Sequence, residues 1–212
     1  MSELTTGWKR MFSVPSLYRL TQQMIGSESS RRRFINEIVR PSLGDRVLDI
    51  GCGTGDLLSL LVETPGLAYV GHDPSTGYIE AARERFGDRG EFLVGGVGEV
   101  PLEDASFDIC VAKGVLHHLD DDLAEQLCDD AARMLRPGGR LVTMDPVFVD
   151  GQSRIARVFA ERDRGQNVRQ VEGYERFARS HFGSVRSSIH HDLLRVPYSH
   201  ALLVCTEPRS VA

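Results

Sequence analysis

The sequence predicts an α/β fold, in which helices cover both faces of a doubly wound, mostly parallel sheet of seven strands that ends in an antiparallel hairpin. Two observations support this fold class. Strand-like and helix-like segments alternate from residue 46 to residue 145, and two strand-like runs beyond residue 183 are joined by a short loop. With 212 residues and 41% hydrophobic content, the chain is expected to form one domain over residues 1–212.

The first half of the chain is expected to supply three strands. Residues 1–30 are too apolar for a disordered tail and are expected to form cap helices. Ser29 or Ser30 is expected to cap the helix of "RRRFINEIV" (31–39), which ends before Pro41. Apolar runs and helical spacing then predict a strand at 46–50, a helix at 56–63, a strand at 68–73, a helix at 77–86 and a strand at 91–94.

The second half is expected to continue the alternation and then to change pattern. A strand is predicted at 107–113, a helix at 121–135 that "RPGG" (136–139) ends, and a strand at 140–145. Two helices are predicted at 152–163 and 173–181. The runs "SVRSSIHH" (184–191) and "YSHALLVCT" (198–206) are then expected to pair as a hairpin at the sheet edge.

Composition and charge exclude several classes of function. A net charge of −5 argues against nucleic-acid binding, because phosphate backbones require a concentrated basic surface. The arginines at 31–33 and those between 154 and 169 are interpreted as solvated faces balanced by acids. No signal peptide and no apolar stretch of about 20 residues is found, so no membrane association and a cytoplasmic location are expected. The four cysteines lie far apart and are expected to be reduced.

The stretch "VLDIGCGTGD" (47–56) is typical of a cofactor-binding loop. Gly51, Gly53 and Gly55 allow a tight turn and close approach of the main chain to a ligand. The dinucleotide pattern G-x-G-x-x-G needs a third glycine where this chain has Asp56, and no G-K-[ST] follows. The pattern that does fit is D-x-G-x-G-x-G, which begins at Asp49.

This motif resembles the first motif of the class I S-adenosylmethionine-dependent methyltransferases, in particular the small-molecule subgroup. The resemblance extends from about Val47 to Asp145 through four motifs in the same order. It implies a Rossmann-like fold, S-adenosylmethionine as cofactor and S-adenosylhomocysteine as product. In the second motif, "VGHDPS" (70–75), the resemblance implies that Asp73 holds the ribose hydroxyls and that Pro74 lies beside the cofactor.

The third and fourth motifs imply further cofactor contacts. "GGVGEVPLEDASFDIC" (95–110) resembles a segment in which an acid after the first glycine contacts the adenine amino group, but this chain has Gly96 there. Adenine recognition is therefore expected to use main chain at Gly96 and Val97, with weaker cofactor affinity or a compensating contact. In "AKGVLHHLDDD" (112–122), Lys113 leaves its strand toward the sulfonium side.

The resemblance also indicates candidate catalytic residues. His118 is the first candidate for a general base and His117 the second, with Asp145 as the group that orients the imidazole or takes part itself. The alternative for His118 is a structural histidine that ties the loop to a helix cap. The cluster "HHLDDD" (117–122) also contains metal-ligand types, but its acids are better explained as the first turn of a helix, and no metal is expected.

The acceptor pocket is expected to be built from residues 1–30 and an acceptor-site insertion at 146–183, as in related enzymes. Candidate lining residues are Tyr18, Arg162, Arg164 and Tyr174. Inward-facing arginines would favour an anionic small molecule. The favoured function is methyl transfer to oxygen by a monomer or homodimer. A cofactor-binding module without transfer activity and a nicotinamide-dependent enzyme are the alternatives.

Overall fold

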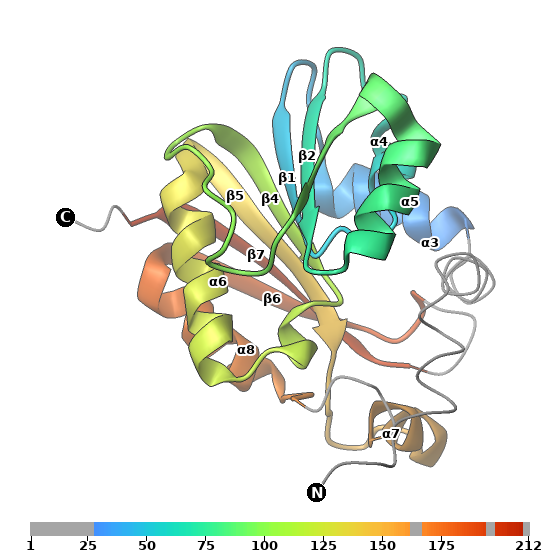
Figure 1. Cartoon of the computed structure of the whole chain (residues 1–212). Helices are drawn as coiled ribbons and strands as arrows, with labels where there is room; N and C mark the ends of the chain where they lie inside the picture. Colours follow the sequence, from blue (N-terminus) through green and yellow to red (C-terminus); the bar gives the residue numbers. More distant parts are fainter. Residues whose placement is uncertain (1–27, 162–166, 194–197, 210–212) are drawn as a thin grey trace, which may run out of the picture.

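The computed structural model describes residues 28–161, 167–193 and 198–209. One sheet runs through the molecule, with helices on both faces (Figure 1). Its seven strands follow the order β3-β2-β1-β4-β5-β7-β6. The strands are β1 (Arg46–Ile50), β2 (Ala68–Asp73), β3 (Glu91–Val94), β4 (Phe107–Lys113), β5 (Leu135–Pro146), β6 (Phe182–His190) and β7 (His200–Pro208).

The strand pairing confirms the predicted fold class. β1 pairs in parallel with β2 on one side and β4 on the other, and β3 and β5 extend the parallel part. β7 runs antiparallel to both β5 and β6. The hairpin therefore joins the sheet through its second strand, so that β6 rather than β7 forms the outer edge. Strand order reverses between β1 and β4, which is where ligands bind in sheets of this kind.

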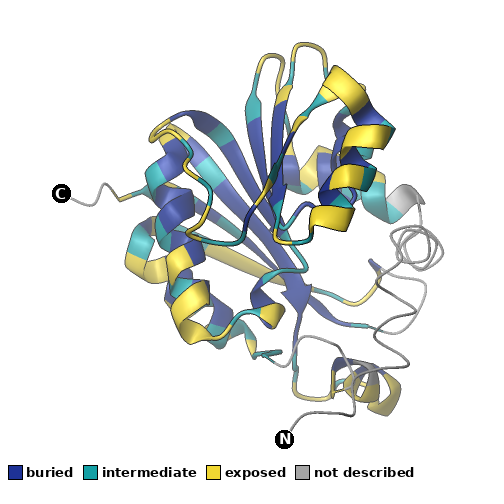
Figure 2. Ribbon diagram, in the orientation of Figure 1, coloured by how far each residue is buried: buried dark blue, intermediate teal, exposed yellow. Residues whose placement is uncertain are grey.

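Helices cover the two faces of the sheet, and its central strands are buried along most of their length (Figure 2). One apolar cluster joins Val47 to Leu58 of α4 (Leu58–Leu61) and to Ile79 of α5 (Thr76–Phe86). The other joins the next residue of β1, Leu48, to Leu127 of α6 (Asp121–Met134), together with residues of α8 (Val171–His181). Neighbouring side chains on a strand point to opposite faces, so both layers pack on the same apolar runs.

Several element boundaries differ from those predicted. α3 (Glu28–Arg33) already contains both serines, so neither Ser29 nor Ser30 caps it, and it continues into a π-helix, η1 (Phe34–Val39). That helix ends before Pro41 as expected, with Arg40 in a left-handed conformation. α4 is shorter than the predicted helix because turns of the glycine loop precede it. "RPGG" belongs to β5, where the pairing with β4 shifts in register.

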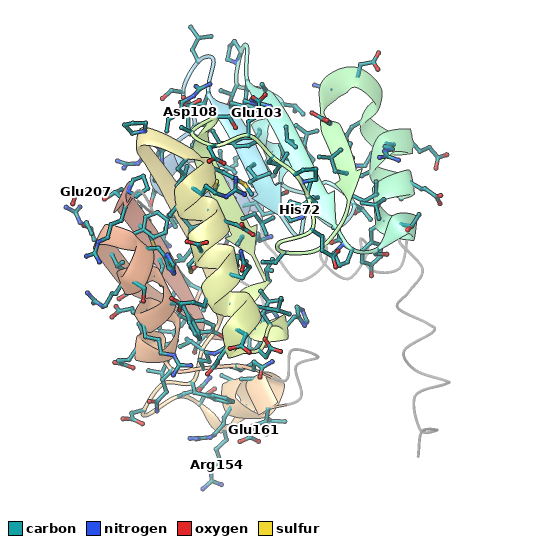
Figure 3. All side chains as sticks on the ribbon, turned by 60° about the vertical axis from the view of Figure 1, so that its left-hand side comes forward. His72, Glu103, Asp108, Arg154, Glu161 and Glu207 are labelled. Carbon is teal, nitrogen blue, oxygen red and sulfur yellow. The ribbon has the colours of Figure 1, made fainter. Side chains whose placement is uncertain are left out.

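The segment between β5 and β6 carries α7 (Arg154–Glu161) beyond the ends of the strands. Figure 3 shows Arg154 and Glu161 of α7 at the opposite end of the molecule from Asp108, which lies at the start of β4. α7 therefore lies toward the carboxyl ends of the parallel strands. Within the described part of the chain, no helix is long and apolar enough to span a membrane. The four cysteines are buried and free.

Candidate active site

The loop after β1 forms one wall of the candidate site. Gly51, Gly53 and Gly55 have φ values of +70°, +54° and +77°. A Cβ atom at Gly51 would lie 2.7 Å from a methyl group of Val115, and one at Gly55 would lie 2.7 Å from the ring of Phe86. The left-handed backbone and the close packing both require glycine here. The loop therefore presents main chain rather than side chains at the carboxyl end of β1.

Asp73, the last residue of β2, holds the glycine loop in place. Its Oδ2 atom accepts a hydrogen bond from the Gly53 N–H at 3.1 Å, and its Oδ1 atom accepts one from the Ser75 N–H at 2.8 Å. Burial raises the pKa of the Asp73 carboxyl group, and these two donors oppose the rise. Ser75, rather than Asp73, provides the side-chain cap of α5. Pro74 is exposed beside Asp73. A carboxylate at the end of the second strand suits ribose hydroxyls.

Asp49 is buried beneath the glycine loop, within β1. Its Oδ2 atom accepts a 2.6 Å hydrogen bond from the Tyr69 hydroxyl of β2. Burial raises the pKa of the Asp49 carboxyl group to about 7, while the Tyr69 hydrogen bond and the charge of Lys113 oppose the rise. Lys113 ends β4, and burial lowers the pKa of its ammonium group. The ionisation of Asp49 is therefore sensitive to any positive charge brought next to it.

A buried hydroxyl group in the glycine loop lacks a hydrogen-bond partner among the described residues. Thr54 is 1% exposed, and its Oγ1 atom makes no hydrogen bond. Its neighbour Asp56 is instead paired with Arg85, with 2.7 Å between Oδ1 and Nη1. Leaving a buried hydroxyl unsatisfied costs about 1–3 kcal/mol. A polar ligand group beside the loop would remove that cost, so the loop fits a nucleoside-bearing cofactor.

The corner after β3 contains an acid, although not at the position that the family pattern predicts. The Oε2 atom of Glu99 accepts a hydrogen bond from the Gly96 N–H at 2.7 Å, and it lies 3.3 Å from where a Cβ atom of residue 96 would be. His72, labelled in Figure 3, lies with Nδ1 3.0 Å from the Gly95 carbonyl oxygen. The Gly95 N–H donates to the Asp73 carbonyl at 3.1 Å, which sets this corner beside the ribose carboxylate. Glu99 was not among the predicted site residues, although the turn "GGVGE" (95–99) brings its acid close to Gly96 and was the signal in the sequence that could have indicated it.

His117 and Asp145 form a buried pair. The His117 Nδ1 atom lies 2.8 Å from Asp145 Oδ1, and the same oxygen accepts the His117 backbone N–H at 3.1 Å. The two side chains are 6% and 2% exposed. Because its partner is a carboxylate, Nδ1 carries the imidazole proton, and Nε2 is the basic nitrogen. This is the arrangement of an oriented general base.

The buried pair lies next to the glycine loop. His117 belongs to the short 3₁₀ helix η3 (Leu116–His118), which follows the Val115 that packs on Gly51. The Gly114 N–H donates to the Met144 carbonyl at 2.7 Å, which joins the end of β4 to the end of β5. A Cβ atom at Gly114 would lie 3.7 Å from the His117 ring. The imidazole is therefore close to the main chain at the carboxyl end of β4.

Two acids of "HHLDDD" are engaged in the local structure. His118, expected as the first candidate base, is exposed, and its ring centroid lies 4.0 Å from that of His117. Asp120 caps α6 through the Leu123 N–H at 3.0 Å, and Asp121 pairs with two arginines. Among the described residues, no group of three or more His, Cys, Asp or Glu side chains is arranged to hold a metal ion.

A cavity of about 340 Å³ lies beside the exit of β5. The Val147 N–H donates to the Ser199 carbonyl at 3.0 Å, so the segment after β5 and the approach to β7 meet there. The cavity is within the size range of small-molecule sites. Its polar lining residues are Asp150, Gln152, Ser153, His191, Tyr198 and Ser199.

The residues expected to line the acceptor pocket are only partly described. Tyr18, Arg162, Arg164 and most of segment 1–30 lie outside the described residues. The expectation for Tyr174 is wrong: this side chain is 1% exposed and packs in the core. Its hydroxyl donates to the Pro146 carbonyl at 2.8 Å, so Tyr174 stabilises the end of β5 and does not face a ligand.

The interpretation of the arginines as solvated faces holds for some of them and fails for one. The exposed side chains of Arg157 and Glu161 pair at 3.4 Å, and Arg33 pairs with Glu37 at 3.3 Å. The side chain of Arg169, in contrast, is only 11% exposed. Nothing in the spacing of the arginines distinguished Arg169 from its neighbours, because its burial depends on where α8 packs.

Comparison with known proteins supports the geometry. The family described as "Methyltransferase domain" matches residues 47–139. An uncharacterized methyltransferase of Anoxybacillus flavithermus is 28% identical over 167 residues, which are 77% of this chain and 75% of that protein. The 27-O-demethylrifamycin SV methyltransferase of Amycolatopsis mediterranei is 38% identical over 111 residues, half of this chain and 40% of that protein.

The fold also matches solved structures. Phosphoethanolamine N-methyltransferase 2 of Haemonchus contortus, in complex with phosphomonomethylethanolamine and S-adenosylhomocysteine, superposes with a TM-score of 0.76 at 16% identity. The superposition covers 99% of this chain and 61% of that one. Apart from the Anoxybacillus protein, the chain spans between 30% and 60% of the curated relatives that it matches.

Proposed function

We propose that the chain is a class I S-adenosylmethionine-dependent methyltransferase and that it transfers a methyl group to an oxygen atom of a small-molecule acceptor. The cofactor, when bound, supplies an electrophilic methyl group on a sulfonium. The glycine loop offers main chain to the nucleoside, and Asp73 offers its carboxylate to the ribose. The unpartnered hydroxyl of Thr54 and the buried carboxyl group of Asp49 suit the polar and cationic methionyl part.

The cofactor wall is completed by the corner after β3 and the end of β4. Main chain at Gly96 and Val97 borders the base, and Glu99 supplies the acceptor oxygen that residue 96 lacks. A hydrogen bond between the Glu99 carboxylate and the adenine amino group is the compensating contact that the Gly96 departure requires. Lys113 lies near enough to Asp49 for their charges to interact, and its ammonium group suits the methionyl carboxylate of the cofactor.

One observation supports transfer chemistry over simple binding: the buried His117–Asp145 pair next to the glycine loop. Binding of the cofactor alone does not require a general base, whereas transfer to a hydroxyl group benefits from one. His117 Nε2 would take the proton of the acceptor hydroxyl as the oxygen–carbon bond forms and the methyl carbon leaves sulfur, which becomes a neutral thioether. Asp145 would stabilise the imidazolium that results. His118 is placed second, because its side chain is exposed, whereas that of His117 is buried against the Asp145 carboxylate.

The cavity beside the exit of β5 is the proposed acceptor site. Its lining of hydroxyl, amide and imidazole groups suits an acceptor with several hydroxyl or carbonyl groups. Asp150 is the charged residue of the described lining, so this cavity favours a neutral acceptor over an anionic one. Oxygen as the methylated atom agrees with the name of the Amycolatopsis relative. A cytoplasmic location and a monomeric or homodimeric state stay predictions.

Calorimetry with S-adenosylhomocysteine and with NAD tests the cofactor. Binding of S-adenosylhomocysteine alone is expected, and binding of NAD alone would overturn the proposal. Transfer is then measured by mass spectrometry on a panel of phenols and polyhydroxylated aromatic compounds. Methylated product from at least one of them is expected. Tight S-adenosylhomocysteine binding without any product would favour the alternative of a cofactor-binding module.

Two variants test the base. His117→Asn is expected to lower turnover of the best acceptor by about 10²–10⁴-fold, the usual contribution of a general base. His118→Asn is the matched control, since it changes the adjacent imidazole in the same way, and it is expected to retain turnover. Both variants should bind S-adenosylhomocysteine normally. Turnover that survives in His117→Asn and disappears in His118→Asn would reverse the assignment.

A further inference from the structure

Arg169 contacts both segments that carry the His117–Asp145 pair. Its backbone joins the segment that follows Asp145: the Phe148 N–H donates to the Arg169 carbonyl at 3.1 Å, and Val147 forms a parallel bridge with Arg169. Its side chain reaches the loop after β4, which contains His117. A single residue therefore touches the exit of β5 and the loop after β4.

The guanidinium of Arg169 holds the His117 loop on both sides of the imidazole. Nη1 donates to the Leu116 carbonyl at 2.8 Å, and Nη2 donates to the Leu119 carbonyl at 2.9 Å. Nη1 also donates to the Asn167 carbonyl at 3.0 Å, and the Asn167 N–H donates to the His117 carbonyl at 3.0 Å. Three carbonyl groups around the histidine are thus bound to the segment that precedes α8.

The position of the guanidinium is itself fixed. Nη2 donates to Asp121 Oδ1 at 2.8 Å, and the guanidinium carbon lies 5.0 Å from the centre of the Phe177 ring. A planar group with five N–H donors can bind several carbonyls and a carboxylate at once and still stack on a ring, whereas an ammonium group cannot reproduce this geometry. These contacts require arginine at position 169.

We propose that Arg169 is a positioning residue that couples the segment after β5 to the orientation of the His117 imidazole. The inference rests on the proposed role of His117 as general base. Residues 149–153 and Ala156 line the proposed acceptor cavity, and the adjacent Phe148 is hydrogen-bonded to Arg169. A shift of this segment on acceptor binding is therefore transmitted to the His117 loop through Arg169. Arg169 itself touches neither cofactor nor acceptor in this scheme.

Proton NMR of the imidazole Nδ1–H tests the proposal without an acceptor. That proton is held by Asp145 in the buried pair, and its resonance is identified by its loss in His117→Asn. In Arg169→Lys, its exchange with solvent is expected to be at least about tenfold faster, the effect of losing one charge-assisted hydrogen bond. S-adenosylhomocysteine affinity is expected to stay within about threefold of the wild type, because that site lies on other elements.

Arg176→Lys is the matched control. Arg176 also pairs with Asp121 and also lies over the Phe177 ring, at 4.5 Å, but donates to none of the three carbonyls. It should leave the exchange rate unchanged. Wild-type exchange in Arg169→Lys, or equal acceleration in both variants, would overturn the proposal. If Arg169→Lys does not fold, Asp121→Asn is used instead, since it removes the carboxylate that binds the guanidinium. It should accelerate the exchange by a smaller factor, and an unchanged exchange rate in this variant would also overturn the proposal.

The two hypotheses fail in different ways. Loss of S-adenosylhomocysteine binding in the wild-type protein would refute the proposed function while leaving the exchange experiment valid. Unchanged exchange in Arg169→Lys, with normal cofactor binding, would refute the positioning role alone.

Discussion

Replacing Asp49 by Asn should change the pH dependence of stability in a defined way. The folded protein holds the Asp49 proton up to a pKa of about 7, whereas in the unfolded chain the same group titrates near 3.8. Between these values the folded state binds a proton that the unfolded chain has released, so the contribution of Asp49 to stability falls as the pH rises from about 4 to about 7. Asn has nearly the same shape, can accept the Tyr69 hydrogen bond through its carbonyl oxygen, and does not titrate.

The size of the effect follows from the two pKa values. A rise from 3.8 to about 7 corresponds to roughly 4 kcal/mol of lost stability once the group is ionised, at 1.36 kcal/mol per pKa unit. The free energy of unfolding of the Asn variant should therefore rise relative to that of the wild type between pH 4 and pH 7. Above pH 7 the difference should stay constant. Local relaxation around a buried charge reduces such values, so a gain of about 1 kcal/mol or more is the expected minimum.

Urea unfolding of both proteins at pH 5, 6, 7 and 8 measures the difference in stability, in which titrating groups that do not interact with Asp49 cancel. Asp88→Asn, in the exposed turn after α5, is the control and should give a constant difference. A constant difference for Asp49→Asn as well would refute the reasoning. The same variant should bind S-adenosylmethionine more weakly at pH 8, because it lacks the negative charge proposed to face the cofactor cation.

Two further substitutions test the cofactor wall. Glu99→Ala should weaken S-adenosylhomocysteine binding about tenfold by calorimetry and remove the preference over S-inosylhomocysteine, which lacks the amino group; an unchanged preference would show that Glu99 does not contact the base. Gly55→Ala should cost roughly 3 kcal/mol in urea unfolding, since its Cβ would meet Phe86 in a left-handed backbone. Gly44→Ala, with a φ of +80° and nothing within 4 Å of the added Cβ, should cost clearly less, and equal costs would contradict the packing argument.

The sheet was largely predictable because its strands are short apolar runs that pack on both faces. The predicted bounds at 46–50, 68–73, 91–94 and 107–113 agree with β1, β2, β3 and β4. The π-helix η1 was not predictable, since its extra residue per turn is a response to packing rather than to local propensity. The "RPGG" segment follows the end of α6, as predicted, and lies within the bounds of β5. The pairing with β4 passes from Leu135 directly to Arg140, so the segment forms an irregularity and keeps its turn character, with Gly138 at a φ of +85°.

The residues on the cofactor side of the site were easier to predict from the sequence than those on the acceptor side. The conformations of Gly51, Gly53 and Gly55 follow from local chemistry, and the motif that contains them is contiguous. The choice between His117 and His118 depends on which adjacent side chain turns toward β5, and a residue pattern cannot decide that. Arg169 lies about 50 residues from its carbonyl partners, so only the packing of α8 reveals its contacts.

The insertion of β7 between β5 and β6 has a consequence for synthesis of the protein on the ribosome. β5 pairs with β7 from Arg140↔Thr206 to Pro146↔His200. About 50 residues must be translated between those strands, which takes roughly 3–10 s at 5–20 residues per second. During that interval the nascent β5 presents an unpaired apolar edge, the kind of surface that recruits chaperones or other strands. Slower translation of this stretch should therefore lower the yield of native protein.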